Sequence, residues 1–176
     1  MSGKKLIVLL TLIVTSIVMF FFFLNINKPK HNVGSDFGAP GIDVKDEKSG
    51  RQLISKDFKN KVVFINFWAT WCPPCREEMP SIESLYKNMS GNDKFQMVTI
   101  LYKDTYQNGT AYMQQNGYTF PVYSDAEGNT AVNYGVTGVP ETYIIDKKGT
   151  LKKRVIGPAE WNSPEAKNFI NSLLNE

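Results

Sequence analysis

The sequence predicts an α/β domain, a layered sandwich of strands and helices with an antiparallel hairpin at one end. Two apolar runs, residues 61–67 (KVVFINF) and 95–101 (FQMVTIL), are rich in β-branched side chains and are typical of buried central strands. A helical segment is expected after each run, and in residues 81–89 the apolar side chains recur every three or four positions. Strands that alternate with helices in this way favour an α/β fold.

The other elements are expected to be short. In chain order they are strands at 42–44, 52–54, 120–123, 141–146 and 151–156, with helices near 110–115 and 129–134. The first two strands flank a polar segment, which indicates an N-terminal hairpin. The last helix begins after Ser163, because a capping serine, a proline at the first helical position and the acid Glu165 are good start signals.

The N-terminal segment predicts a membrane anchor. Residues 6–24 (LIVLLTLIVTSIVMFFFFL) form 19 positions without a charge, long enough to cross the hydrocarbon core of a bilayer. Lys4 and Lys5 precede this run, so residues 1–5 are expected in the cytoplasm. A cleaved signal peptide is the alternative, but the run is long and no small-x-small cleavage site follows it. We therefore expect a single-pass anchor, a linker at 25–36 and a domain at 37–176 on the extracytoplasmic side.

The formal charge of +3 is concentrated at the N-terminus, where four lysines flank the apolar run. Beyond His31, 16 basic residues face 17 acidic ones, so the predicted domain is close to neutral. A nucleic-acid-binding face would require clustered basic side chains. The nearest cluster lies at 147–154 around a Lys-Gly turn, and we interpret it as the solvated end of a hairpin.

The chain has only two cysteines, Cys72 and Cys75, and they lie three positions apart. A disulfide between them closes almost no loop, so it contributes little stability by constraining the unfolded chain. A structural zinc site needs four ligands, whereas the chain offers these two thiols and His31. Haem attachment needs His after the second cysteine, where the sequence has Arg76, and a peroxide-reducing cysteine normally has Thr at the position of Ala69. Thiol–disulfide chemistry therefore remains the preferred interpretation.

A Cys-x-x-Cys motif between a buried strand and a helix suits that chemistry. The free backbone N–H groups and positive dipole of a helix N-terminus favour a thiolate on the first cysteine. That thiolate attacks a disulfide of the substrate, and the second cysteine resolves the mixed disulfide. We expect Cys72 to be the exposed nucleophile and Cys75 to be the shielded resolving thiol.

The segment FWATWCPPCREEMP resembles the active site of the thioredoxin superfamily. With the predicted anchor and the segment VTGVPETYIID, the chain is similar to the membrane-tethered TlpA/ResA/CcmG (DsbE) branch from about residue 37 onward. This resemblance implies a thioredoxin fold, a mixed sheet flanked by helices, with an N-terminal hairpin extension and a central αβ insertion. It also implies a cis Val139–Pro140 bond and substrate contacts from Trp71, Pro73, Val139 and Pro140.

Thioredoxin's buried acid on the central strand is replaced by Asn66, and an amide cannot accept the proton of the resolving thiol. The resemblance implicates instead the acid three positions after the second cysteine, Glu78, although an exposed helix acid is the alternative interpretation. Glu141, directly after Pro140, is a second candidate. We expect Trp161 to be a packing residue.

The dipeptide Pro73-Pro74 predicts a reducing protein. It carries no charge and removes two N–H donors from the first helical turn, so it leaves mainly the Cys75 N–H for the Cys72 sulfur. By resemblance, the substrates are protein disulfides, for example in apocytochrome c or copper-site assembly proteins, and the electron donor is a membrane thiol transporter of the CcdA/DsbD type. No cofactor or metal is expected besides the redox-active pair. The alternatives are a disulfide-forming oxidant and a redox-inactive binding module.

Overall fold

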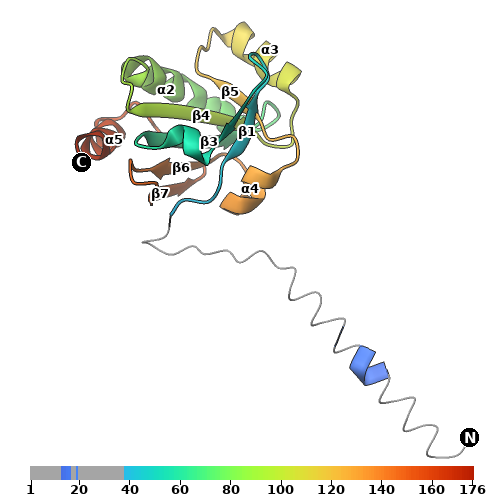
Figure 1. Cartoon of the computed structure of the whole chain (residues 1–176). Coiled ribbons are helices and arrows are strands. Elements are labelled where there is room, and N and C mark those ends of the chain that lie inside the picture. Colours follow the sequence, from blue (N-terminus) through green and yellow to red (C-terminus); the bar gives the residue numbers. More distant parts are fainter. Residues whose placement is uncertain (1–12, 17–18, 20–37) are drawn as a thin grey trace, which may run out of the picture. The chain divides into compact units, whose positions relative to one another are not determined.

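A computed structural model describes residues 13–16, 19 and 38–176 of the chain (Figure 1). The chain divides into two compact units, residues 1–31 and 32–176. In the first unit, residues 13–16 and Met19 are helical. Most of the predicted anchor at 6–24, the cytoplasmic segment at 1–5 and the linker at 25–36 lie outside the described residues. Within the described ranges, no helix has the length and apolar character needed to cross a bilayer.

The second unit is an α/β domain built on one sheet of seven strands, which confirms the predicted fold class. Its strands are β1 (Asp43–Asp46), β2 (Arg51–Ile54), β3 (Val62–Trp68), β4 (Phe95–Leu101), β5 (Val122–Ser124), β6 (Glu141–Ile145) and β7 (Leu151–Ile156). Its helices are η1 (Ser55–Phe58), α2 (Pro73–Met89), α3 (Tyr106–Asn116), α4 (Asn129–Tyr134) and α5 (Pro164–Asn175).

The sheet is mixed, with strand order β2-β1-β5-β4-β3-β6-β7. Strand β3 lies parallel to β4 and antiparallel to β6, and β4 lies parallel to β5. The N-terminal hairpin β1–β2 joins the sheet through β5, and α3 with β5 forms the expected αβ insertion between β4 and α4. The two central strands are buried along almost their whole length, as their apolar sequences predict.

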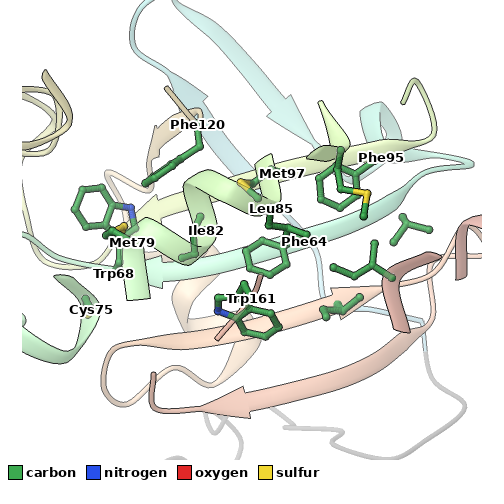
Figure 2. Packing of buried hydrophobic residues seen from close by; sticks show 14 of the residues in the cluster. Phe64, Trp68, Cys75, Met79, Ile82, Leu85, Phe95, Met97, Phe120 and Trp161 are labelled. Atoms are coloured by element: carbon green, nitrogen blue, oxygen red, sulfur yellow. The ribbon is translucent and has the colours of Figure 1, made fainter. Parts of the chain in front are cut away.

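The two faces of the sheet carry separate apolar cores. One core joins side chains of β3 and β4 to α2 and α5, and Figure 2 shows part of it, with Trp161 against Phe64. Those two rings meet edge to face, with centroids 4.8 Å apart. The other core contains the alternate side chains of β3, β4 and β6 and is covered by α4, η1 and the segment entering β1. Because side chains alternate along a strand, Asn66 of β3 points to the first face and Phe67 to the second.

Several element bounds differ from the prediction by one to four residues, and two differences have a clear local cause. The strand expected at 120–123 is observed as β5 from Val122, because Pro121 has no N–H and the N–H of Phe120 donates to the side chain of Glu83 at 3.2 Å. The short helix η1 was not predicted. Its Asp57 accepts a hydrogen bond from the N–H of Ile54 at 2.9 Å, a local turn that apolar periodicity does not indicate.

Candidate active site

The two cysteines lie where β3 passes into α2. Cys72 is the N-cap residue of α2 and has extended backbone angles, while Pro73 and Pro74 occupy the first helical positions. The N–H of Cys75 donates to the Cys72 sulfur at 3.2 Å. The N–H of Arg76 donates to the Cys72 carbonyl and is therefore not available to the sulfur. The sulfur of Cys72 therefore has the backbone donor that the two-proline sequence predicts.

Cys72 and Cys75 form a disulfide, and both residues are largely removed from solvent. Cys75 is fully buried, as expected, but Cys72 is only 3% exposed. The expectation of an exposed Cys72 is therefore wrong for the disulfide form. The carbonyl oxygen of Val139 lies 3.5 Å from the Cys72 sulfur, so the loop before β6 covers this side of the pair.

The loop before β6 carries the expected cis Val139–Pro140 bond. Pro140 is buried and Val139 is half-buried beside the disulfide. The carbonyl of Pro140 accepts the N–H of Gly157 at 2.9 Å, which joins this loop to the end of β7. The cysteines, Val139 and Pro140 are thus brought together from segments about 65 residues apart, as their sequence spacing shows.

Glu78 is buried on the first face of the sheet, with 3% of its surface exposed. Its Oε1 accepts the Asn66 amide at 2.8 Å, and its Oε2 accepts the Ala159 backbone N–H at 3.1 Å and the Trp161 indole N–H at 3.2 Å. The alternative interpretation of Glu78 as an exposed helix acid is excluded by this burial. Burial raises the pKa of Glu78, and the hydrogen bonds from Asn66, Ala159 and Trp161 offset part of the rise.

Asn66 connects Glu78 to β6. Its amide nitrogen also donates to the Thr142 hydroxyl at 2.9 Å, so one NH₂ group serves two acceptors on different elements. Asn66 and Thr142 are paired positions of β3 and β6. The amide oxygen of Asn66 is buried and has no hydrogen-bond partner among the described residues.

Glu141 lies on the opposite face of the sheet from Glu78. It is paired with Phe67 across β3 and β6, and its neighbour Thr142 points towards Asn66. The carboxylate of Glu141 forms an ion pair with Arg154 of β7 and accepts the Tyr143 hydroxyl at 2.7 Å. The structure therefore groups Glu78, but not Glu141, with Asn66 on the face that contains Cys75.

A second loop shapes the surface beside the disulfide. Asp104, after β4, accepts both the N–H and the hydroxyl of Thr70, at 2.7 and 2.6 Å. The next residue, Trp71, donates its indole N–H to the Lys103 carbonyl at 3.2 Å and remains 56% exposed. Burial opposes ionisation of Asp104, but the hydrogen bonds from Thr70 and Asn108 lower the pKa of this carboxyl overall. Trp71 is thus a fixed, exposed ring next to Cys72 and Pro73.

Three partners of the two candidate acids were not predicted from the sequence. Trp161 was expected only to pack, whereas its indole N–H also contacts Glu78. Ala159 contributes a backbone donor, which no side-chain pattern could indicate. Arg154 was assigned to a solvated hairpin end, whereas it is paired with buried Glu141. A tryptophan in the polar segment GPAEWNSPEA is the one signal that could have directed attention to this loop.

In the described part of the chain, no three His, Cys, Asp or Glu side chains are grouped so that they could hold a metal ion. The reactive groups at the start of α2 are instead the Cys72–Cys75 disulfide, the cis-proline loop and the buried carboxyl of Glu78. Together with the mixed sheet, this arrangement defines a thioredoxin-like protein of the thiol–disulfide oxidoreductase class.

Comparisons with known proteins agree with this class. The AhpC/TSA family model matches residues 35–154, and the chain belongs to this family. It is 37% identical over 133 residues to the thioredoxin-like protein YneN of Bacillus subtilis (strain 168), covering 73% of this chain and 76% of that protein. It is 36% identical over 134 residues to the thiol-disulfide oxidoreductase ResA of Bacillus thuringiensis (strain Al Hakam), covering 74% of this chain and 73% of that one.

A solved structure is similar over the whole domain. The thiol:disulfide interchange protein of the thioredoxin family from Chlorobium tepidum TLS superposes with a TM-score of 0.65 at 25% sequence identity. The match covers 81% of this chain and 99% of that chain. These relatives confirm the predicted fold and the predicted family resemblance.

Proposed function

We propose that this protein is an extracytoplasmic thiol–disulfide oxidoreductase that reduces disulfides in other proteins through Cys72 and Cys75. The observation that carries the proposal is the disulfide at the N-terminus of α2, with the cis Val139–Pro140 loop against it. A purely structural disulfide does not explain this pair, because the bridge closes too short a loop to stabilise the fold appreciably.

The reaction begins from the dithiol form. The Cys72 thiolate attacks one sulfur of a substrate disulfide, which forms a mixed disulfide and releases the other substrate sulfur as a thiolate that takes up a proton. The Cys75 thiol then loses its proton, and its sulfur attacks Cys72. This second exchange releases the remaining substrate thiol, so the substrate gains two electrons and the protein returns to the Cys72–Cys75 disulfide.

The second step needs a group that accepts the proton of Cys75. Glu78 is supported for this role because it is buried on the same face as Cys75 and because burial raises its pKa, which makes the carboxylate a stronger base. Asn66 cannot accept the proton, and it contributes a hydrogen bond that holds the carboxylate of Glu78. We assign Glu78 as the proton acceptor and Asn66 as a positioning residue.

The surface around Cys72 supports binding of an extended substrate segment. Val139 borders the disulfide, and a residue that precedes a cis-proline can pair its backbone with a substrate strand. Trp71 and Pro73 are exposed next to the pair and offer apolar contact area. We assign Trp71, Pro73, Val139 and Pro140 to substrate binding.

The direction of electron flow follows from Pro73 and Pro74. Strongly oxidising relatives stabilise the Cys thiolate heavily, and the uncharged dipeptide here leaves the Cys72 sulfur chiefly one backbone donor. A weakly stabilised thiolate favours the disulfide form of the protein and hence a reducing couple. We therefore propose a potential well below the roughly −120 mV of strong oxidants.

The proposed setting is the outer side of a membrane, with residues 6–24 as the anchor. Extracytoplasmic proteins that need free thiols, such as apocytochrome c or copper-site assembly proteins, are the proposed substrates. The protein would be reduced again by a membrane thiol transporter of the CcdA/DsbD type. No cofactor besides the dithiol is needed for this exchange.

Trapping tests the proposal directly. A Cys75→Ala variant keeps the Cys72 nucleophile but cannot resolve the mixed disulfide, so it should accumulate covalent complexes that reducing agent releases. The double variant Cys72→Ala/Cys75→Ala is the matched control and should trap nothing. A redox-inactive binding module would give no reducible complexes with either variant.

The potential of the Cys72/Cys75 pair separates the reductant from the disulfide-forming oxidant. Equilibration with glutathione or dithiothreitol buffers and mass spectrometry of alkylated protein gives this value. A potential near −120 mV would show that the protein installs disulfides instead of reducing them.

A further inference from the structure

A pocket of about 460 Å³ opens at the end of the sheet opposite the disulfide. Its lining includes Val63, at the start of β3, and Ile145, at the end of the antiparallel strand β6. Cys72 follows the other end of β3, and a strand rises by about 3.3 Å per residue, so the pocket and the disulfide are separated by roughly the length of the strand.

The inner wall of the pocket is apolar and its rim is basic. Ile42, Phe58, Val63 and Ile145 line it and are all less than 10% exposed. Four lysines also line it, two from η1 and its end and two from the turn after β6: Lys56, Lys59, Lys147 and Lys148. The Lys147 ammonium donates to the Leu174 carbonyl at 2.9 Å, so Lys56, Lys59 and Lys148 are the cations considered for a ligand. The volume lies in the range of ligand pockets, which are mostly apolar with a few polar groups that determine orientation.

The positive charge of the rim is not neutralised by the acid within it. Asp146 is the carboxylate that lines the pocket, and it is paired with Lys152 at 3.2 Å and accepts the Lys148 and Thr150 N–H groups, each at 2.9 Å. Burial opposes its ionisation, but these partners lower the pKa of Asp146 overall. Across residues 38–176, no carboxylate forms an ion pair with Lys56, Lys59 or Lys148.

The chain enters the domain at this rim. Ala39 lines the pocket and donates its N–H to the Gly149 carbonyl in the turn after β6, while Gly38 is bridged to Thr150. Thirteen residues, 25–37, separate the proposed anchor from Gly38. Thirteen residues have a contour length of at most about 45 Å, so an anchor at residues 6–24 would limit the distance between this rim and the bilayer surface.

We propose that this lysine-rimmed pocket binds an anionic phospholipid of the membrane in which the chain is anchored. The inference rests on the anchoring in the proposed function. An anionic phospholipid matches both parts of the pocket, because its phosphate complements the lysines and its apolar portion complements the inner wall. Binding at this end would hold the disulfide at the far end of β3, directed away from the bilayer and open to substrates.

Hydrogen exchange of the full chain in lipid nanodiscs tests the inference. Discs of phosphatidylglycerol and of phosphatidylcholine with identical acyl chains differ only in headgroup. In phosphatidylglycerol, the amides of residues 55–60 and 147–149 should exchange at least five-fold more slowly than in phosphatidylcholine. The amides of α3 should exchange equally in both discs and serve as the internal reference.

Charge variants make the test specific. Lys56→Glu/Lys59→Glu/Lys148→Glu should abolish the difference between the two lipids. The control Lys48→Glu/Lys153→Glu/Lys167→Glu has the same change of charge outside the pocket and should keep the difference. Equal exchange at residues 69–76 in all three proteins would show that the fold at the disulfide is unchanged.

Each other outcome overturns the inference. Slow exchange that is equal in the two lipids, no slowing in either lipid, or slowing that persists in the pocket variant would each contradict binding of an anionic phospholipid here. A chain that does not co-elute with the discs would refute the anchoring as well as this inference. The dithiol chemistry is tested separately by trapping and is unaffected by that result.

Discussion

The indole N–H of Trp161 donates to the carboxylate of Glu78 at 3.2 Å, although the two residues are 83 positions apart. Trp161 lies between β7 and α5, whereas Glu78 lies one turn into α2. This hydrogen bond and those from Asn66 and Ala159 stabilise the ionised form of a carboxyl whose pKa is raised by burial. A loop from the C-terminal part of the chain therefore lowers the pKa of the proposed proton acceptor, against the effect of burial.

Trp161→Phe should shift the pH dependence of mixed-disulfide resolution upward. The substitution keeps an aromatic ring against Phe64 but removes the indole donor, and loss of a donor to the carboxylate raises the pKa of Glu78 further. A hydrogen bond to a charged group is worth about 1.5–3 kcal/mol, so a shift of about one to two pH units is expected. Stopped-flow measurement of resolution across pH detects it. In a Glu78→Gln background, Trp161→Phe should produce no additional shift.

Moving the carboxyl from position 78 of α2 to position 66 of β3 should preserve part of the activity. Glu78→Gln alone removes the proposed proton acceptor and should slow resolution by about 10²-fold, within the usual contribution of a general base. Asn66→Asp/Glu78→Gln places a carboxyl on β3, hydrogen-bonded to the amide on α2, and should recover at least ten-fold of that loss. The control is attack by Cys72 on the substrate, which should change little. Equal rates in the single and double variants would contradict our assignment of the proton acceptor.

Stability should fall with rising pH through the ionisation of Glu78. The pKa of Glu78 in the folded protein is raised above the ordinary value of 4.5, so the folded state holds this proton where the unfolded chain has released it. The contribution of Glu78 to the free energy of unfolding is therefore largest below pH 4.5 and is lost as the pH rises through the folded pKa.

Urea unfolding of the wild-type protein and of Glu78→Gln at several pH values isolates this contribution. The stability of Glu78→Gln relative to the wild type should increase as the pH rises from about 4.5. Subtraction is needed because carboxyls with lowered pKa, such as Asp104 and Asp146, change stability in the opposite direction. A difference that does not depend on pH would contradict the raised pKa.

Glu141 and Arg154 should stabilise the fold as a pair, so the effects of changing each residue should not be additive. Glu141 is almost completely buried, so Arg154→Met would leave its carboxylate without its cationic partner and should cost about 3 kcal/mol. Glu141→Gln/Arg154→Met removes both charges and should cost clearly less than the sum of the two single changes. A double-mutant cycle by urea unfolding measures the coupling. If Glu141 is instead a proton acceptor for Cys75, Glu141→Gln will slow resolution as much as Glu78→Gln does.

Much of the fold could be predicted because the apolar periodicity is strong where the elements are buried. The run 95–101 coincides with β4, and β3 differs by one residue at each end, since both strands are apolar on two faces. The start of α2 at the cysteines and the Ser163 cap of α5 follow from local chemistry. Local patterns failed at β5, where the N–H groups of Thr119 and Phe120 bind the Glu83 side chain of a different element.

The candidate site was predicted less completely, for a related reason. Cys72, Cys75 and the cis-proline are carried by short motifs, and these are visible in the sequence. Glu78 and Glu141 are both acids near those motifs, and only the alternation of β6 shows that they lie on opposite faces of the sheet. Donors such as the Ala159 N–H depend on the path of the backbone, so they become apparent only in the folded structure.

The hydrogen bonds of Glu78 also have a consequence for biosynthesis. A ribosome releases α2 long before the segment 159–161, so a growing chain holds both thiols before it holds two of the three donors to Glu78. Until the segment 159–161 is made, Glu78 would lack two of its three hydrogen-bond donors. Because these donors hold the proposed proton acceptor, a chain without that segment would resolve a mixed disulfide more slowly than the finished protein.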